Sequence, residues 1–212
     1  MAGPAADVKK NAGGAFVRPY NAETDYDAVL EICKATADAS YASALELVPY
    51  LYAIPYLLLS PTYAHVLDSG AGTVVGYIIG TPNTRAFVRR YRDTYLPRTT
   101  LPPPTSDPPS KLRRSLEESY ARPEGMIRED VVDEFPAHLH VDILESHQSQ
   151  GWGTVLMERF LGELKGGGEA VKGVHLAMGK ENVRAGRFYG RCGFVARGDL
   201  GDGATWMARG MD

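Results

Sequence analysis

Two glycines open an expected helix directly after a polar turn. The segment reads Gln148, Ser149, Gln150, Gly151, Trp152, Gly153 and Thr154, and an apolar run that predicts a strand precedes it. Backbone N–H groups at a helix N-terminus attract phosphate through hydrogen bonds and the helix dipole. Glycine lets a bulky phosphate approach the backbone without a Cβ clash. The pattern predicts a phosphate-binding turn, with an ordinary helix start that contains two glycines as the alternative.

Two familiar phosphate sites do not match this turn. A mononucleotide P-loop requires Gly-Lys followed by Ser or Thr, and the sequence contains no such triplet. The dinucleotide fingerprint requires a third glycine where this sequence has Leu156. The ligand must therefore be identified from other residues.

Three polar side chains alternate with apolar ones just before the turn. His138, His140 and Asp142 share one face of an expected strand, because strand side chains alternate between faces. Unpaired polar groups are costly to bury, so this row must face a cavity, water or hydrogen-bond partners. Asp142 is the first candidate for a general base and His140 the second. The alternatives are a His–Asp network that only shapes a pocket, and a metal site.

A second motif follows one strand and one helix later. It consists of Asn182, Ala185, Phe188, Tyr189, Gly193 and Phe194. Together with Gln148, Gly151 and Gly153, this pattern resembles the GNAT superfamily of acetyl-CoA-dependent N-acetyltransferases. That family has a Gln/Arg-x-x-Gly-x-Gly/Ala loop, then Asn-x-x-Ala-x-x-Phe/Leu-Tyr and Gly-Phe. The resemblance covers residues 136–209 and extends to the first expected strand and helix.

A narrower resemblance rests on Tyr50-x-Tyr52-x-x-Pro55-Tyr56, on Glu134 to Asp142, and on Gly151-Trp152-Gly153. These segments resemble acetyltransferases related to the C-terminal acetyltransferase-like domain of O-GlcNAcase. The chain departs from the usual family loop at Glu145, where proline is frequent, and at Ser149, where glycine is common. Neither departure removes a backbone donor.

The resemblance implies acetyl-CoA as the acyl donor. Amides around Ser149, Gly151, Gly153 and Thr154 would hold its pyrophosphate, the Ile143 amide would bind the acetyl carbonyl, and Asn182 would steady the pantetheine arm. The full set implied for acetyl-CoA is Val141, Ile143, Leu144, Gln148, Ser149, Gln150, Gly151, Trp152, Gly153, Thr154, Asn182 and Tyr189.

The resemblance also implies a mechanism. A neutral amine would attack the thioester directly in a ternary complex, without a metal. Tyr189 would be the general acid, because a thiolate leaves more readily when a phenol donates a proton to it. Tyr52, Tyr56 and His138 would line the acceptor site, with core packing as the alternative for the tyrosines. A noncatalytic module that binds acetyl-CoA is the alternative function.

The surrounding periodicity predicts the elements that carry these residues. Expected strands cover 16–18, 63–67, 73–81, 137–144, 173–178, 193–197 and 204–209. Expected helices cover 24–40 (capped by Thr24 or Asp25), 83–95, 111–120, 124–133, 152–165 and 182–191, with a proline-broken helix at 43–60.

Strands that alternate with helices predict an α/β fold. The resemblance specifies the GNAT fold: a mixed sheet of six to seven strands, a splay between strands 4 and 5, and helices on both faces. Residues 1–14 are expected to form a flexible tail, and residues 15–212 a single domain. A proline-rich and helical insertion at about 97–133 interrupts that domain.

Composition excludes several classes of protein. The 212 residues carry 23 basic and 26 acidic side chains, and 44% are hydrophobic, which excludes a disordered chain and disfavours a nucleic-acid partner. Two cysteines form no disulfide framework. The longest apolar stretch, 48–59, is too short to span a membrane. We expect a cytoplasmic protein, with the nucleus also compatible, acting as a monomer or homodimer on acetyl-CoA and an unidentified amine.

Overall fold

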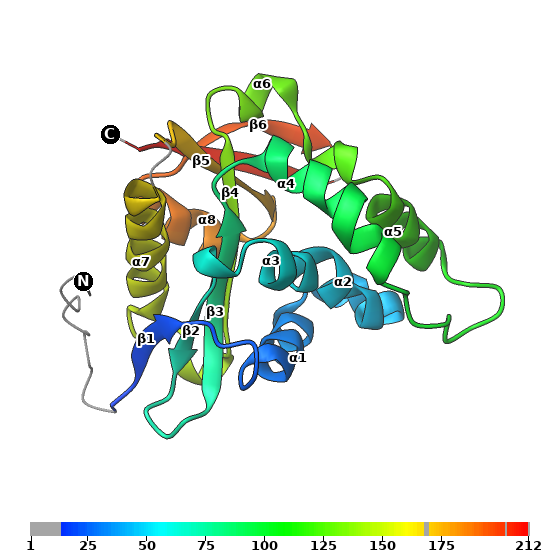
Figure 1. Cartoon of the computed structure of the whole chain (residues 1–212), viewed down its shortest axis with the longest axis horizontal. Helices are drawn as coiled ribbons and strands as arrows, with labels where there is room; N and C mark the ends of the chain where they lie inside the picture. The colour runs from blue at the N-terminus through cyan, green and yellow to red at the C-terminus, as the bar shows by residue number, and fades with distance from the viewer. Residues whose placement is uncertain (1–13, 168–169, 202, 212) are drawn as a thin grey trace.

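A seven-stranded mixed sheet forms the centre of the molecule (Figure 1). The computed structural model describes residues 14–167, 170–201 and 203–211, so the expected tail lies outside the described residues except for Gly14. The strands are β1 (Phe16–Pro19), β2 (His65–Asp68), β3 (Val74–Thr81), β4 (Ala137–Ile143), β5 (Gly173–Gly179), β6 (Val195–Gly201) and β7 (Ala204–Gly210). Their order is β1-β2-β3-β4-β5-β7-β6, and only the β4–β5 pair is parallel. The strand count, the mixed sheet and the expected strand positions are confirmed.

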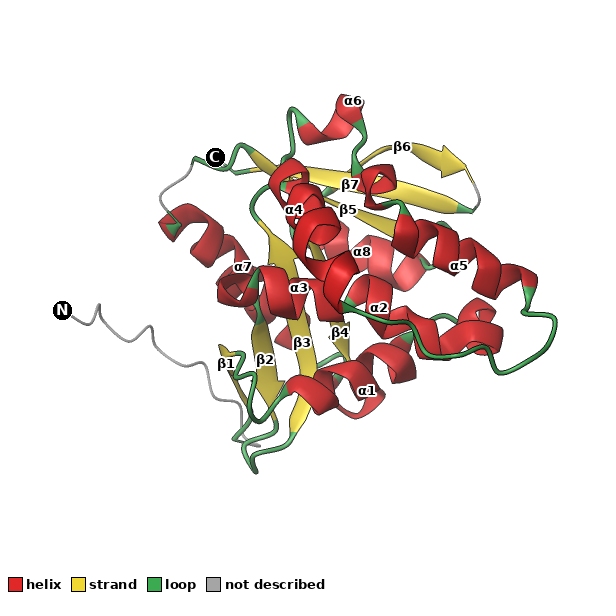
Figure 2. Ribbon diagram, turned by 45° about the vertical axis from the view of Figure 1, so that its right-hand side comes forward, coloured by secondary structure: helices red, strands yellow, loops and turns green. Residues whose placement is uncertain are grey.

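Helices cover both faces of this sheet (Figure 2). They are α1 (Tyr26–Thr36), α2 (Val48–Tyr52), α3 (Ile54–Leu59), α4 (Thr84–Arg90), α5 (Lys111–Ala121), α6 (Glu129–Val132), α7 (Trp152–Gly166) and α8 (Val183–Arg191). Short 3-10 turns add η1 (Ala39–Leu47), η2 (Pro61–Tyr63), η4 (Leu96–Arg98), η5 (Pro123–Met126) and η6 (Glu145–His147), and η3 (Tyr91–Tyr95) is a π-helical turn. Helix α7 packs on one face, whereas α1 to α3 pack on the other.

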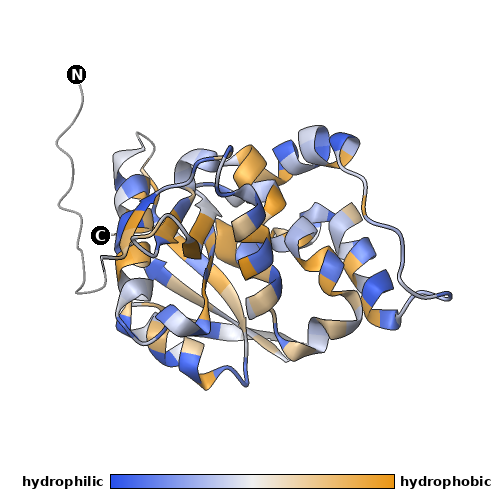
Figure 3. Cartoon of the chain, turned by 90° about the horizontal axis from the view of Figure 1, so that it is seen from below, coloured by the Kyte–Doolittle hydropathy of each residue, from blue (hydrophilic) through white to orange (hydrophobic). Residues whose placement is uncertain are grey.

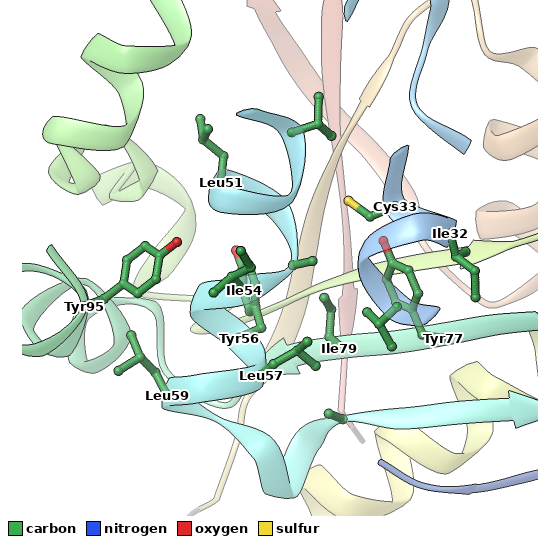
Figure 4. Close-up of a cluster of buried hydrophobic side chains, with 14 of the residues drawn as sticks. Ile32, Cys33, Leu51, Ile54, Tyr56, Leu57, Leu59, Tyr77, Ile79 and Tyr95 are labelled. Carbon is green, nitrogen blue, oxygen red and sulfur yellow. The ribbon is translucent and has the colours of Figure 1, made fainter. Parts of the chain in front are cut away.

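The core is divided between the two faces, as alternation along the strands requires. Tyr77 and Ile79 of β3 contact the α1 to α3 side, and Ile78 contacts the α7 side. All eight residues of β3 are buried, because helices cover both faces of the sheet at this strand. Figure 4 shows Tyr77 and Ile79 beside Cys33 and the α3 side chains, and Figure 3 shows apolar residues gathered on the central strands.

The apolar segment Ala39–Leu59 is long and apolar enough to cross a membrane by length and composition alone. The chain breaks it into η1, α2 and α3, and many of its side chains, including Leu47, lie in the core. The break between α2 and α3 falls at Ala53, because Pro55 stands in the first turn of α3 and lacks the N–H that a continuous helix needs. The expected proline-broken helix is thus confirmed.

Two expectations about helices are wrong. Thr24 and Asp25 do not cap α1: the Asp25 carboxylate instead accepts hydrogen bonds from Arg18 at 2.6 Å and 2.9 Å. That ion pair draws the acidic group away from the helix N-terminus. The expected helix over 124–133 is two short pieces, η5 and α6, separated by extended backbone at Ile127 and Arg128.

One buried cation holds the proline-rich part of the insertion in place. Arg113 of α5 is 2% exposed. Its guanidinium lies 2.5 Å from Glu46 of η1 and 2.8 Å from Glu117, and donates to the carbonyls of Pro102 and Pro103. Residues 99–110 thus run as an irregular strap between η4 and α5, as the loop at the far right of Figure 1 shows.

Candidate active site

Strands β4 and β5 separate shortly after they begin. They pair only at Ala137–Val174 and His138–His175. On the other side of β4, the Leu144 N–H donates to the Val75 carbonyl at 2.9 Å. Inward and outward backbone groups alternate along an antiparallel pair, so the N–H and C=O groups of Val141 and Ile143 point away from β3 into the opening. The predicted splay is confirmed, and it leaves the Val141 backbone groups and the Ile143 N–H without a strand partner.

The turn between β4 and α7 has the backbone shape of an anion site. Ser149 has φ of 60° and Gly151 has φ of 87°, both in the left-handed region. Such a turn directs successive N–H groups to one side. The Gln148 side chain donates to the Ile143 carbonyl at 2.6 Å and ties the turn to the opened strand.

A cavity of about 420 Å³ joins the turn to the opening. The predicted residues that line it are Val141, Asp142, Ile143, Gln148, Ser149, Gly151, Gly153, Thr154, Asn182 and Tyr189. Three other predicted residues lie outside its wall: Leu144 packs against the core, the Gln150 amide donates to the Ser146 carbonyl, and Trp152 is buried. Their contribution would come through the backbone or through packing.

Helix α8 closes the far wall of this cavity. A Cβ on Gly153 would meet the Phe188 ring at 2.9 Å, so a larger residue there would require that ring to move away from α7. The Asn182 side chain caps α8 by accepting from the Ala185 N–H at 3.0 Å. Arg184 donates to the Ser149 hydroxyl at 2.9 Å, which brings a cation to the turn.

Of the residues predicted from the sequence, the two titratable ones that line this cavity are Asp142 and Tyr189. The Tyr77 hydroxyl donates to the Asp142 carboxylate at 2.5 Å. Burial raises the pKa of Asp142, although Tyr77 and Thr36 act to lower it. Burial, together with the nearby Asp142 charge, raises the pKa of Tyr189, so this phenol keeps its proton at neutral pH.

The two histidines of β4 belong to one chain of hydrogen bonds. The Thr84 hydroxyl lies 2.8 Å from the Pro136 carbonyl and 2.7 Å from Nδ1 of His138. The Tyr56 hydroxyl lies 2.8 Å from Nε2 of His138 and 3.1 Å from Nε2 of His140.

A carbonyl oxygen at one end of this hydrogen-bond chain fixes which group donates in each of its bonds. The Pro136 carbonyl only accepts, so Thr84 donates to it and accepts from Nδ1–H of His138. Nε2 of neutral His138 then accepts from Tyr56, whose oxygen accepts from Nε2–H of His140. By this assignment, Nδ1 of His140 carries a free lone pair.

These imidazoles are neutral at physiological pH. Burial, together with the nearby His175, lowers the pKa of His140 to about 4. Burial likewise holds the pKa of His138 well below its usual range and lowers that of His175. Nδ1 of His175 lies 2.6 Å from the Phe135 carbonyl and must donate to it, which leaves Nε2 of His175 as an acceptor.

A second cavity, of about 370 Å³, lies at the other end of the opening. Its wall includes all three predicted acceptor-site residues, Tyr52, Tyr56 and His138, and also His140. The insertion contributes Ser119, Arg122, Gly125, Met126, Arg128 and Val131, and β5 and β7 contribute His175 and Trp206.

Four residues of the site escaped sequence reasoning: Thr36, Tyr77, Thr84 and His175. Tyr77 and Thr84 become partners of the β4 row only through the β3–β4 register and the approach of α4. His175 gave a usable signal, because it is polar between Val174 and Leu176 in an apolar strand. Among residues 14–167, 170–201 and 203–211, no three His, Cys, Asp or Glu side chains are grouped to hold a metal ion.

Comparisons with known proteins agree with this geometry. A family model described as the acetyltransferase (GNAT) family matches residues 115–194. The crystal structure of SsHAT is 38% identical, with a TM-score of 0.80 over 94% of this chain and 99% of that one. PaiA N-acetyltransferase from Thermoplasma acidophilum in complex with coenzyme A is 13% identical, with a TM-score of 0.56 over 92% and 98% of the chains. The NatC complex bound to Gag peptide and CoA is likewise 13% identical, with a TM-score of 0.54 over 92% and 98%. The last two share the fold.

Proposed function

This chain belongs to the acetyltransferase (GNAT) family, and from that premise we propose where acetyl-CoA binds and how its acetyl group passes to an amine. The observation that carries the proposal is the opening between β4 and β5, which has a turn with left-handed φ angles at one end and a second cavity at the other. A donor and an acceptor thus have separate sites that meet along β4.

The residues around the 420 Å³ cavity fit acetyl-CoA. Backbone N–H groups from Ser149 to Thr154, supported by the α7 dipole and by Arg184, would hold the pyrophosphate. The outward groups of Val141 and Ile143 would pair with the pantetheine arm in place of a neighbouring strand. An N–H at this position also supplies a preformed donor for the oxygen that becomes negative in acyl transfer.

The hydrogen-bond chain favours His140 as the general base. Its free Nδ1 lone pair belongs to a residue of the acceptor cavity, where an incoming amine arrives first. Asp142 lines only the donor cavity and is already bonded to Tyr77, so it is the alternative base, reached through water.

Tyr189 is the proposed general acid. The amine nitrogen forms a bond with the acetyl carbon, and Nδ1 of His140 takes a proton from that nitrogen. The C–S bond breaks, and the Tyr189 hydroxyl gives its proton to the CoA sulfur. Water then returns a proton to Tyr189 and removes one from His140, so both groups are restored. The raised pKa of Tyr189 keeps its proton available for that donation.

A narrower assignment within the family is supported by the sequence resemblance at Tyr52, Pro55 and residues 134–142. We propose that the chain belongs with the acetyltransferases related to the C-terminal domain of O-GlcNAcase. The alternative function, a module that binds acetyl-CoA without catalysis, predicts binding but no thiol release.

Two measurements on the same protein test this function. Calorimetry with acetyl-CoA should detect binding, and thiol release with an amine panel should detect turnover. Tyr189→Phe should lower kcat by about a hundredfold and leave the Kd for acetyl-CoA unchanged. Tyr20→Phe, a half-buried tyrosine outside both cavities, is the matched control. Unchanged turnover in Tyr189→Phe would remove the general acid, and no binding of acetyl-CoA would overturn the proposal.

A further inference from the structure

The acceptor cavity has an unusual distribution of charge for a site that receives an amine. Its wall contains no aspartate or glutamate among the described residues. Its only charged side chains are Arg122 and Arg128, both contributed by the insertion. Ammonium groups are ordinarily held by carboxylates, so this wall offers nothing to pair with a positively charged acceptor.

The two arginines stay at the wall because each has a carboxylate partner outside it. Arg122 pairs with Glu118 at 2.9 Å, and Arg128 pairs with Asp130 at 2.8 Å while lying 5.9 Å from the centre of the Trp206 ring. A second positive charge on an acceptor would meet these guanidinium groups and be repelled by them, more strongly at the half-buried Arg128 than at the exposed Arg122, where solvent screens the charge.

Aromatic and aliphatic side chains form most of the remaining wall. They include Leu51, Tyr52, Tyr91, Met126, Leu176 and Trp206. At about 370 Å³ the cavity is within the range of small-molecule sites. Such a lining stabilises an apolar body by removing its surface from water.

The rings of His140 and His175 both line this apolar space, and each neutral imidazole has one nitrogen that can accept a hydrogen bond. Nδ1 of His140 keeps its lone pair because Nε2–H donates to Tyr56. Nδ1–H of His175 donates to the Phe135 carbonyl, the Ala137 backbone also interacts with this ring, and Nε2 of the neutral ring keeps its lone pair. The His138 ring, which lies between them in the cavity, has both nitrogens occupied by Tyr56 and Thr84. Neutral lone pairs accept N–H bonds from an uncharged amine, the form that attacks a thioester.

We propose, on the basis of the acetyl transfer proposed above, that the acceptor is a monoamine with an apolar body, and that Nε2 of His175 accepts a hydrogen bond from its nitrogen. Polyamines and lysine-rich peptides are excluded by the same wall. His175 is then a substrate-binding residue that the sequence did not indicate.

A matched pair of acceptors tests the charge argument. Hexylamine and diaminohexane have the same carbon chain and differ by one amino group. With acetyl-CoA saturating, we expect kcat/KM for hexylamine to exceed that for diaminohexane by about tenfold. Equal values or the reverse order, with acetyl-CoA still bound in calorimetry, would overturn this inference and leave the proposed function intact. Absence of acetyl-CoA binding would overturn both, so the two failures are distinguishable.

Charge reversal gives a second test in the same assay. Arg122→Glu places a carboxylate on an exposed part of the wall and should lower the hexylamine preference by about threefold, because solvent screens the charge. Arg114→Glu, an exposed position on α5 outside the cavity, should leave the preference unchanged. An equal preference for hexylamine over diaminohexane in both variants would contradict the proposal that the charge of the wall selects the acceptor.

The His175 assignment has its own variants. His175→Asn retains a donor for the Phe135 carbonyl and removes the Nε2 lone pair, so KM for hexylamine should rise by about tenfold while the Kd for acetyl-CoA is unchanged. His175→Gln places an amide oxygen near the Nε2 position and should restore part of that loss. An unchanged KM in His175→Asn would overturn the assignment.

Discussion

At the scale of single residues, the site depends on which nitrogen of each histidine carries a proton. Four side chains form one chain of hydrogen bonds. It starts at the Pro136 carbonyl and runs through Thr84, His138 and Tyr56 to His140. None of the first three residues needs to touch substrate to affect the reaction. They are positioning residues for the lone pair of His140.

Removing the central hydroxyl of this chain should impair catalysis without affecting donor binding. Tyr56→Phe releases His140 to take the other tautomer, so we expect kcat to fall by about tenfold and the Kd for acetyl-CoA to stay constant. Nitrogen NMR of the imidazoles should show a mixture of tautomers. Tyr52→Phe is the control, because that hydroxyl lines the same cavity but lies 3.3 Å from Tyr41 instead. Equal kcat values for the two variants would contradict a positioning role.

The buried histidines also predict how stability depends on pH. The folded-state pKa of His140 is about 4, whereas an unfolded histidine has a pKa near 6.5. Between these values the unfolded state binds the proton and the folded state does not. The stability that neutral His140 contributes is therefore complete above pH 6.5 and is lost as the pH falls toward about 4.

Denaturant unfolding at a series of pH values measures this effect. Each such histidine adds a slope of at most about 1.4 kcal/mol per pH unit in that window. His140→Gln should reduce the slope, and so should a matched change at His65, whose pKa burial also lowers to about 4. A slope equal to that of the wild-type chain in His140→Gln would show that His140 is protonated in the folded state.

At the scale of elements, the turn before α7 and the strap before α5 place the two cavities. Ser149 adopts a φ of 60° where the family commonly has glycine, and its hydroxyl accepts from Arg184. The turn thus has a left-handed residue at position 149 although that residue is serine. The strap holds the insertion against η1, and the insertion in turn forms one wall of the acceptor cavity.

Arg113 should prove necessary for placing the insertion beside the acceptor cavity. Arg113→Met leaves Glu46 and two proline carbonyls without their buried partner, so we expect a loss of about 3 kcal/mol in the free energy of unfolding. Cleavage within residues 99–110 by a protease should become faster. Lys111→Met, at an exposed position of the same helix, should change neither measurement.

Kinetics and binding with the two ligands distinguish a structural effect of Arg113→Met from a catalytic effect. In Arg113→Met, KM for the acceptor should rise, whereas the Kd for acetyl-CoA should not change, because the turn from Ser149 to Thr154 lies at the other end of the opening. A parallel loss of acetyl-CoA binding would mean that the strap supports the whole site.

At the scale of the whole molecule, one strand connects both cavities. Residues 138–140 of β4 line the acceptor cavity, and residues 141–143 line the donor cavity. The sheet is covered by α7 on one face and by α1 to α3 on the other (Figure 1), and the two cavities adjoin along β4 between His140 and Val141.

Donor binding should therefore stabilise the whole fold. At a free acetyl-CoA concentration a thousandfold above Kd, the free energy of unfolding should rise by about 4 kcal/mol, which a thermal scan reads as a Tm higher by about 10 °C. Gly151→Val forces a β-branched side chain into a φ of 87° and should abolish this increase. A full increase in that variant would place the pyrophosphate away from the turn.

Much of this architecture was predictable because its signals are local. The alternation of His138, His140 and Asp142 identified their shared face, and the glycines at 151 and 153 identified the turn. The predicted cap of α1 was wrong because Arg18 binds the Asp25 carboxylate. The predicted helix at 124–133 was wrong because extended backbone at Ile127 and Arg128 divides it.

The amino-acid sequence alone determined the family pattern, the order of strands and helices, and the row of polar groups on β4, since each follows from residue type and short-range spacing. Only the tertiary structure decided which nitrogens of the histidines are free, and that Arg113 fastens the insertion beside the acceptor cavity. Those properties depend on contacts between residues far apart in the chain, such as Tyr56 with His140 and Glu46 with Arg113. No local pattern encodes such contacts, because they exist only after the sheet has brought its neighbours together.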